Sequence, residues 1–151
     1  MNSPLPDLKM KNPAQLPVRI VIFGDSISAY RDNLNVASLQ LSERLKSEGI
    51  ATLLKAIQEK APASKILLMG ILPRGESIRE ANNEKIRQTN AKLASLADNT
   101  RIFYLDVGDQ LVEPDGSISK EIMPDKLHLA GPGYTRWMDA MKPTLDKLLN
   151  E

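Results

Sequence analysis

The chain contains no cysteine and only one histidine. It therefore forms no disulfide and has no thiolate nucleophile, and one imidazole is too few for the cysteine and histidine ligand sets of zinc sites. Its 20 Lys and Arg residues balance 19 Asp and Glu residues to a net charge of +1, which gives no overall field for attracting nucleic-acid phosphates or anionic lipids. One Trp, three Tyr and two Phe do not interleave with basic residues as they do in single-strand binders. We therefore expect no metal, no cofactor and no nucleic-acid partner.

Long hydrophobic runs are also missing from the sequence. Residues 1–17 are polar, and no apolar run in them reaches the length of a signal peptide or of a membrane helix. This segment contains four prolines, Pro4, Pro6, Pro13 and Pro17. We interpret residues 1–17 as an extended N-terminal arm and residues 18–151 as a single domain, because 151 residues is close to the usual length of one domain. No integral membrane segment is expected, and the missing targeting signal and missing cysteine favour a cytoplasmic location.

Three apolar runs rich in β-branched or aliphatic residues indicate buried strands. They cover residues 18–23, 65–72 and 102–107. Helix formers at helical spacing predict helices between and after them, over residues 36–60 (one helix, or two broken near Gly49), 80–96 and 132–149. Strands that alternate with helices imply right-handed crossovers and a parallel sheet covered by helices. The prediction is an α/β fold of the flavodoxin-like three-layer kind, abbreviated to about three strands.

The helical spacing also predicts which side chains face the core. Apolar stripes run along each predicted helix, and their members include Leu53 and Leu54 in the first, Ala81, Ile86 and Leu93 in the second, and Tyr134, Trp137, Met138, Met141, Leu145 and Leu148 in the third. Pro143 lies within the last helix and is expected to kink it.

In a parallel α/β sheet the ligand crevice lies outside the carboxyl ends of the strands. Directly after the first predicted strand come Gly24, Asp25 and Ser26. A serine at a sharp strand-to-helix turn can present its hydroxyl as a nucleophile, and its own backbone N–H can donate to an oxyanion. The same three residue types are also common where a turn caps a helix, so the motif alone leaves both interpretations open.

The single histidine, His128, follows Asp125 by three residues. In one helical turn, positions i and i+3 share a face, so the carboxylate can hold one ring nitrogen while the other faces a hydroxyl. The alternative is a capping aspartate beside a half-buried structural histidine. Together, however, Ser26, His128 and Asp125 supply the three roles of a catalytic triad, and all map to the edge of the sheet where ligands bind.

These motifs resemble those of the SGNH or GDSL hydrolase family, and the second half of the chain is most similar to its platelet-activating-factor acetylhydrolase-like branch. The resemblance covers residues 49–149 without obvious gaps. It is carried by Gly24-Asp25-Ser26, by residues 65–76 and 115–119, by Asp125-Lys126-Leu127-His128-Leu129, and by Gly133, Tyr134 and Trp137.

The resemblance implies a serine ester hydrolase. Ser26 would attack the carbonyl, His128 would act as the base, and Asp125 would orient the imidazole. It also implies a small-molecule substrate with a short acyl group, most simply acetyl, carried on a lipid or a carbohydrate. Arg74 and Glu76, which follow the second strand, either contact the substrate or simply turn the chain.

The sequence departs from the family pattern between the serine and the helix near Gly49. Family members carry a glycine after their second strand and a Gly-x-Asn block after their third, both of which supply oxyanion donors, and neither block occurs here. At about 30 residues per βαβ unit, two missing units shorten the chain by roughly 50 to 60 residues. Residues 30–34 resemble the family sequence that follows the Gly-x-Asn block. This resemblance predicts that the first strand takes the place of the family's third strand and that Ser26 lies near the position of the oxyanion asparagine.

Two alternatives to an active esterase stay open. One is a catalytically impaired SGNH-like domain that serves as a binding or interaction module. The other is a phosphate-binding flavodoxin-like domain that uses Asp25 and Ser26, which leaves Asp125 and His128 unexplained. A sheet of about three strands also has exposed edges, so we expect a homo-oligomer that protects them.

Overall fold

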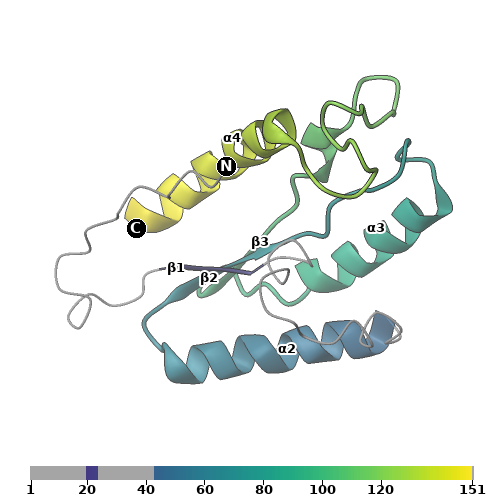
Figure 1. Ribbon diagram of the computed structural model, residues 1–151. Coiled ribbons are helices and arrows are strands. Elements are labelled where there is room, and N and C mark those ends of the chain that lie inside the picture. The colour runs from purple at the N-terminus through teal and green to yellow at the C-terminus, as the bar shows by residue number, and fades with distance from the viewer. Residues whose placement is uncertain (1–19, 24–42, 151) are drawn as a thin grey trace.

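The computed structural model describes residues 20–23 and 43–150 (Figure 1). The predicted arm over residues 1–17 lies outside the described residues, as do Asp25 and Ser26. The elements are β1 (Ile20–Phe23), α2 (Glu43–Lys60), β2 (Lys65–Met69), α3 (Ala81–Ala94), β3 (Ile102–Leu105), the short 3₁₀ helix η2 (Gly108–Leu111) and α4 (Gly131–Asn150).

The three strands form one parallel sheet in the order β1-β2-β3. The register places Phe23 beside Leu68, and Leu68 beside Tyr104. All three strands therefore direct their carboxyl ends to the same edge of the sheet. The predicted parallel sheet of about three strands is confirmed.

Strand β2 lies at the centre of the sheet and is buried on both faces. Alternate side chains of a strand point to opposite faces, so Ile66 and Leu68 enter one core while Leu67 and Met69 enter another. All four are at most 3% exposed. This double burial explains why β2 reads as a continuous apolar run in the sequence.

Helices cover both faces of the sheet, as Figure 1 shows. The first core contains Leu54 of α2 and Leu93 of α3 together with Ile66 and Leu68. The second core, on the opposite face, contains Met141 and Leu148 of α4. The arrangement is a three-layer α/β fold, in agreement with the sequence.

Several predicted core positions on the helices are wrong. Leu53 is 42% exposed, Tyr134 43% and Met138 58%, and Ala81 is also exposed. On α4 the buried residues are Gly133, Met141 and Leu148. Tyr134 and Met138 are exposed although both lie within about 60° of Met141 at about 100° per residue, so helical spacing alone does not decide which side chains the core covers.

Helix continuity answers the point left open at Gly49, whereas the kink expected at Pro143 stays a prediction. Helix α2 passes through Gly49 as one helix from Glu43, and the part of the prediction over residues 36–42 lies outside the described residues. Helix α4 continues through Pro143 to Asn150. None of the helices in the described part of the chain is long and apolar enough to span a lipid bilayer.

The place of β1 in the sheet bears on function. In flavodoxin-like sheets the strand order is 2-1-3-4-5, so the neighbour of the fourth strand is the third and not the first. Here β1 pairs directly with β2, which in turn pairs with the last strand, β3. If β2 and β3 correspond to the fourth and fifth strands, β1 occupies the third strand's place, as residues 30–34 led us to expect.

The two cores generate a test of the fold. Leu67→Ala and Leu68→Ala each empty a position that is at most 1% exposed, on opposite faces of β2. Each is expected to lower the free energy of unfolding by about 2–5 kcal/mol in urea denaturation, whereas the matched control Leu53→Ala costs less than about 1 kcal/mol. Equal losses at Leu53 and Leu67 would contradict the described packing.

Candidate active site

The turn that contains Asp125 and His128 immediately precedes α4. One carboxylate oxygen, Asp125 Oδ1, accepts the backbone N–H of Leu127 at 3.0 Å and of His128 at 2.7 Å. The other, Oδ2, lies 2.5 Å from His128 Nδ1. Aspartate favours this kind of turn because its short side chain reaches backbone amides two or three residues ahead. The structure thus brings together two of the three predicted site residues.

The electrostatics of this pair fix the state of the carboxylate. The hydrogen bond from the His128 ring, aided by the backbone N–H bonds, lowers the pKa of Asp125 from its ordinary 3.8 to about 2. Asp125 is therefore ionised at neutral pH. Because it engages Nδ1, it favours the tautomer in which Nδ1 carries the proton and Nε2 presents a lone pair.

The pair lies at the surface, with side-chain exposures of 50% for His128 and 54% for Asp125. Half of the His128 side chain is exposed, and Asp125 accepts backbone N–H groups as a capping aspartate does, so the structural interpretation of the pair stays open beside the catalytic one. The His128 ring is held by a carboxylate and is still accessible to a small molecule. This combination is what a general base needs.

A second segment, the β2–α3 loop (residues 70–80), lies beside this turn. The backbone N–H of Gly75 donates to the Lys126 carbonyl at 2.8 Å, and Lys126 Nζ lies 2.7 Å from Glu76 Oε1. The ion pair lowers the pKa of Glu76 and raises that of Lys126. The loop and the turn are thus joined by a backbone hydrogen bond and by an ion pair.

The β2–α3 loop is itself held by the first turn of α3. The buried side chain of Asn83 accepts the N–H of Arg74 at 2.9 Å and donates to the carbonyls of Arg74 and Ser77 at 2.7 and 2.8 Å. Glu80 Oε1 accepts the N–H groups of Glu76 and Ser77 at 2.6 and 3.2 Å. Two side chains from one helix end therefore position the whole loop.

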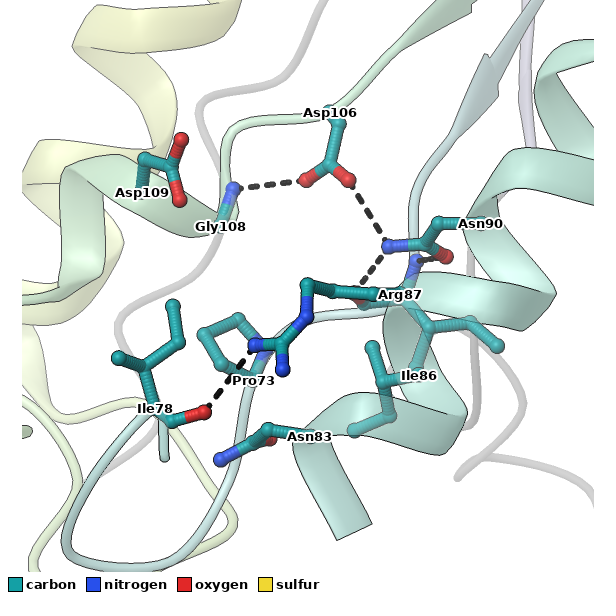
Figure 2. Close-up of a pocket in the computed structure, with 10 residues that line it drawn as sticks. Pro73, Ile78, Asn83, Ile86, Arg87, Asn90, Asp106, Gly108 and Asp109 are labelled. Atoms are coloured by element: carbon teal, nitrogen blue, oxygen red, sulfur yellow. Dashed lines mark hydrogen bonds between the residues drawn. The ribbon is translucent and has the colours of Figure 1, made fainter. Parts of the chain in front are cut away.

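A small pocket opens at the same edge of the sheet, between α3 and the segments that follow β2 and β3. Its volume is about 50 Å³, and its walls include Pro73, Ile78 and Ile86. Figure 2 shows the Asp106 carboxylate between two donors, the Gly108 N–H and the Asn90 amide, each at 2.9 Å. Neither Asp125 nor His128 lines this pocket, so it and the Asp–His pair are separate features of the edge.

The third predicted site residue, Ser26, lies outside the described residues, so its position relative to His128 stays a prediction. In sequence it follows Phe23, the last residue of β1, by three positions. No cluster of three His, Asp or Glu side chains that could bind a metal ion occurs over residues 20–23 and 43–150.

Sequence reasoning missed the residues that support the turn. Asn83, Asn90 and Glu80 act through backbone groups of the β2–α3 loop, and nothing in their own sequence neighbourhood marks such contacts. The one signal is the Pro-Arg-Gly-Glu stretch after β2, where the sequence leaves Glu76 either as a substrate contact or as part of a chain reversal. The structure pairs Glu76 with Lys126, and the substrate contact stays a prediction.

Comparison with known proteins places these features in a family. Residues 22–136 match the GDSL-like Lipase/Acylhydrolase family. The chain is 36% identical over 102 residues to human platelet-activating factor acetylhydrolase IB subunit alpha1 and 34% identical over 108 residues to the rat alpha2 subunit, covering 67% and 68% of this chain. These alignments span 44% and 45% of the relatives, so the chain matches slightly less than half of their length.

A solved structure supports the fold independently. The crystal structure of a GDSL-like lipase from Bacteroides thetaiotaomicron superposes with a TM-score of 0.59 at 20% identity, over 87% of this chain and 62% of the other. At that identity the likeness concerns the fold alone. The match over residues 22–136 shows that the chain belongs to the GDSL-like lipase/acylhydrolase family.

Proposed function

We propose that this chain is a serine ester hydrolase that works through an acyl-enzyme, with Ser26 as nucleophile, His128 as base and Asp125 as the residue that orients the base. The observation that carries the proposal is the 2.5 Å contact between His128 Nδ1 and Asp125 Oδ2 in an exposed turn. Membership of an acylhydrolase family supports hydrolase chemistry.

The reaction proceeds in two balanced steps. In the first, Ser26 Oγ attacks the ester carbonyl while His128 Nε2 takes the hydroxyl proton, and the same proton then passes to the departing alcohol. In the second, a water molecule gives a proton to His128 and attacks the acyl-enzyme; the bond from the acyl carbon to Ser26 Oγ then breaks, the same proton passes from His128 to Ser26 Oγ, and the carboxylic acid leaves. The backbone N–H of Ser26 is the proposed oxyanion donor.

Asp125 makes this proton transfer possible by holding the imidazole in one tautomer and one orientation. Its lowered pKa, about 2, keeps the carboxylate ionised when His128 becomes positively charged in each step. The two backbone N–H bonds to Oδ1 fix the carboxylate itself. The orienting residue is therefore preorganised before a substrate arrives.

The proposed substrate is a small molecule with a short-chain acyl ester, most simply an acetyl ester on a lipid or a carbohydrate. The support comes from relatives that are named platelet-activating factor acetylhydrolase subunits. Because the chain matches less than half of their length, the whole activity of those proteins is carried over only as a proposal.

The position of β1 favours a second candidate function, a catalytically impaired binding domain. Neighbouring strands lie about 4.8 Å apart. A serine that follows the third-strand position is therefore displaced by about one strand spacing from the place of a first-strand nucleophile. Loss of one oxyanion donor alone typically costs about 10²–10³ in turnover.

We also propose that the chain forms a homo-oligomer. Within the described part of the chain, β1 and β3 each pair on one side only, with β2. Strand edges with open backbone groups are templates for pairing with another chain. A second copy is a partner that presents the same edges.

The triad generates the first functional prediction. Ser26→Ala and His128→Ala are each expected to lower hydrolysis of p-nitrophenyl acetate by at least about 10³-fold, and a fluorophosphonate probe is expected to label the wild type but not Ser26→Ala. Ser95→Ala, at the exposed C-terminal cap of α3, serves as a matched serine control with wild-type activity. Hydrolysis that survives either triad change would exclude the mechanism, and absence of labelling in the wild type would favour the impaired binding domain.

Asp125 generates a prediction about pH. Its folded-state pKa of about 2 lies below the ordinary 3.8, so its stabilising effect is complete above about pH 5 and is lost as the pH falls toward 2. Asp125→Asn lacks this component. The fall in the urea unfolding midpoint between about pH 6 and about pH 2.5 is therefore expected to be smaller for Asp125→Asn than for the wild type, and an identical fall would contradict the described turn.

The open strand edges generate a prediction about assembly. Sedimentation velocity of the chain at micromolar concentration is expected to give a dimer or a larger species, with a fraction that rises with concentration. A clean monomer over the whole concentration range would remove the oligomer proposal and would leave the esterase proposal untouched.

A further inference from the structure

The β2–α3 loop contacts the Asp125–His128 turn through one backbone hydrogen bond and one ion pair. The turn is a short surface segment, and its backbone at Lys126 has a φ of 65°, in the left-handed region that lysine seldom adopts. Such a conformation is strained for a residue with a Cβ and persists only where the surroundings hold it. The structure must therefore supply contacts that hold Lys126 in place.

Two contacts from the loop act on Lys126, one on its backbone and one on its side chain. The Gly75 N–H donates to the Lys126 carbonyl at 2.8 Å, and Glu76 Oε1 lies 2.7 Å from Lys126 Nζ. Lys126 itself lies between Asp125 and His128 in the sequence. Any rotation of its backbone would change the distance between the carboxylate and the imidazole.

The loop is rigid enough to hold the turn because α3 fixes it. Asn83 is 1% exposed and makes three hydrogen bonds to the backbone of Arg74 and Ser77. Gly75 adopts a φ of 88°, and a Cβ there would collide with the Glu80 carboxylate. Glu80 thus occupies the space that a side chain at position 75 would need while it accepts the N–H groups of Glu76 and Ser77.

The ion pair itself is too exposed to serve mainly for stability. The side chains of Lys126 and Glu76 are 54% and 67% exposed, and exposed pairs contribute little to folding. Its distinctive property is its location, because it ties the residue between Asp125 and His128 to a loop fixed by α3.

We propose that Glu76 and Lys126 are positioning residues, which with the Gly75 N–H hold the Asp125–His128 turn in the geometry that its proton transfer requires. We call these contacts of Glu76 and the Gly75 N–H with Lys126 the clamp. Its effect on the rate of hydrolysis rests on the proposed esterase function, whereas its effect on the Asp125–His128 hydrogen bond does not. Misplacement of a catalytic group by about 1 Å can cost about 100-fold in rate, so a partial loosening is expected to cost less.

The test uses Glu76→Gln, Lys126→Gln and the exchanged double variant Glu76→Lys with Lys126→Glu in the full chain. The control is Lys142→Gln, which breaks a comparably exposed ion pair with Asp146 on α4, where Lys142 is 68% exposed. Two experiments are made. The first measures kcat and KM for p-nitrophenyl acetate, and the second records the downfield proton resonance of the His128 Nδ1–H. Since the chain has one histidine, that resonance needs no assignment among several rings.

Each single variant is expected to lower kcat by about 3- to 10-fold with KM within about twofold, and to weaken or broaden the Nδ1–H resonance. The exchanged variant restores at least half of each loss, and Lys142→Gln changes neither quantity. The clamp is overturned if both single variants match Lys142→Gln, or if the exchange restores nothing.

The outcomes separate this proposal from the esterase proposal. If the wild type hydrolyses no ester but the resonance responds to Glu76→Gln and Lys126→Gln as stated, the clamp stands and the esterase fails. If Ser26→Ala and His128→Ala abolish hydrolysis but the single clamp variants change nothing, the esterase stands and the clamp fails.

Discussion

The buried amide of Asn83 is the interaction on which the edge of the sheet depends. Once β2 ends at Met69, the chain must leave the sheet and reach α3, and its backbone groups lose their strand partners. A buried backbone group without a partner costs about as much as a lost hydrogen bond or more. Asn83 satisfies three such groups with one side chain, and Asn90, two turns later on the same face, binds both the N–H and the carbonyl of Ile71. These amides let the β2–α3 loop take a fixed path past the Asp125–His128 turn.

The layers of the fold could be predicted from the sequence because each strand carries its own signal. The run around Leu67 is apolar on both faces, as a central parallel strand must be, and the helices carry apolar residues at helical spacing. The inner face of α3 could not be predicted in the same way. Three of its four buried residues are Asn83, Thr89 and Asn90. Asn83 and Asn90 are satisfied by partners outside the helix, which the local sequence does not reveal.

In the candidate site, too, local contacts could be predicted from the sequence and distant contacts could not. The Asp125–His128 pair could be predicted because its members lie three positions apart and because the aspartate itself favours the turn that joins them. The support of that turn by Glu76 could not be predicted, since Glu76 and Lys126 lie 50 positions apart and an ion pair of exposed side chains leaves no pattern in the sequence. For Ser26 the sequence supplies the residue type and its place after β1, and its distance from His128 remains a prediction.

The Asp125–His128 pair is formed within one short turn, and this explains how a sheet of three described strands can still carry it. The pair lies in the turn before α4, and the β2–α3 loop that contacts this turn follows the central strand β2. The pair does not need the strands that would carry the family's glycine and asparagine blocks. A base and its orienting carboxylate can therefore persist in full geometry whether or not a nucleophile faces them. The Asp125–His128 contact therefore supports the base and the orienting carboxylate of the proposed triad, and turnover depends in addition on where a serine after β1 lies when β1 is the direct neighbour of β2.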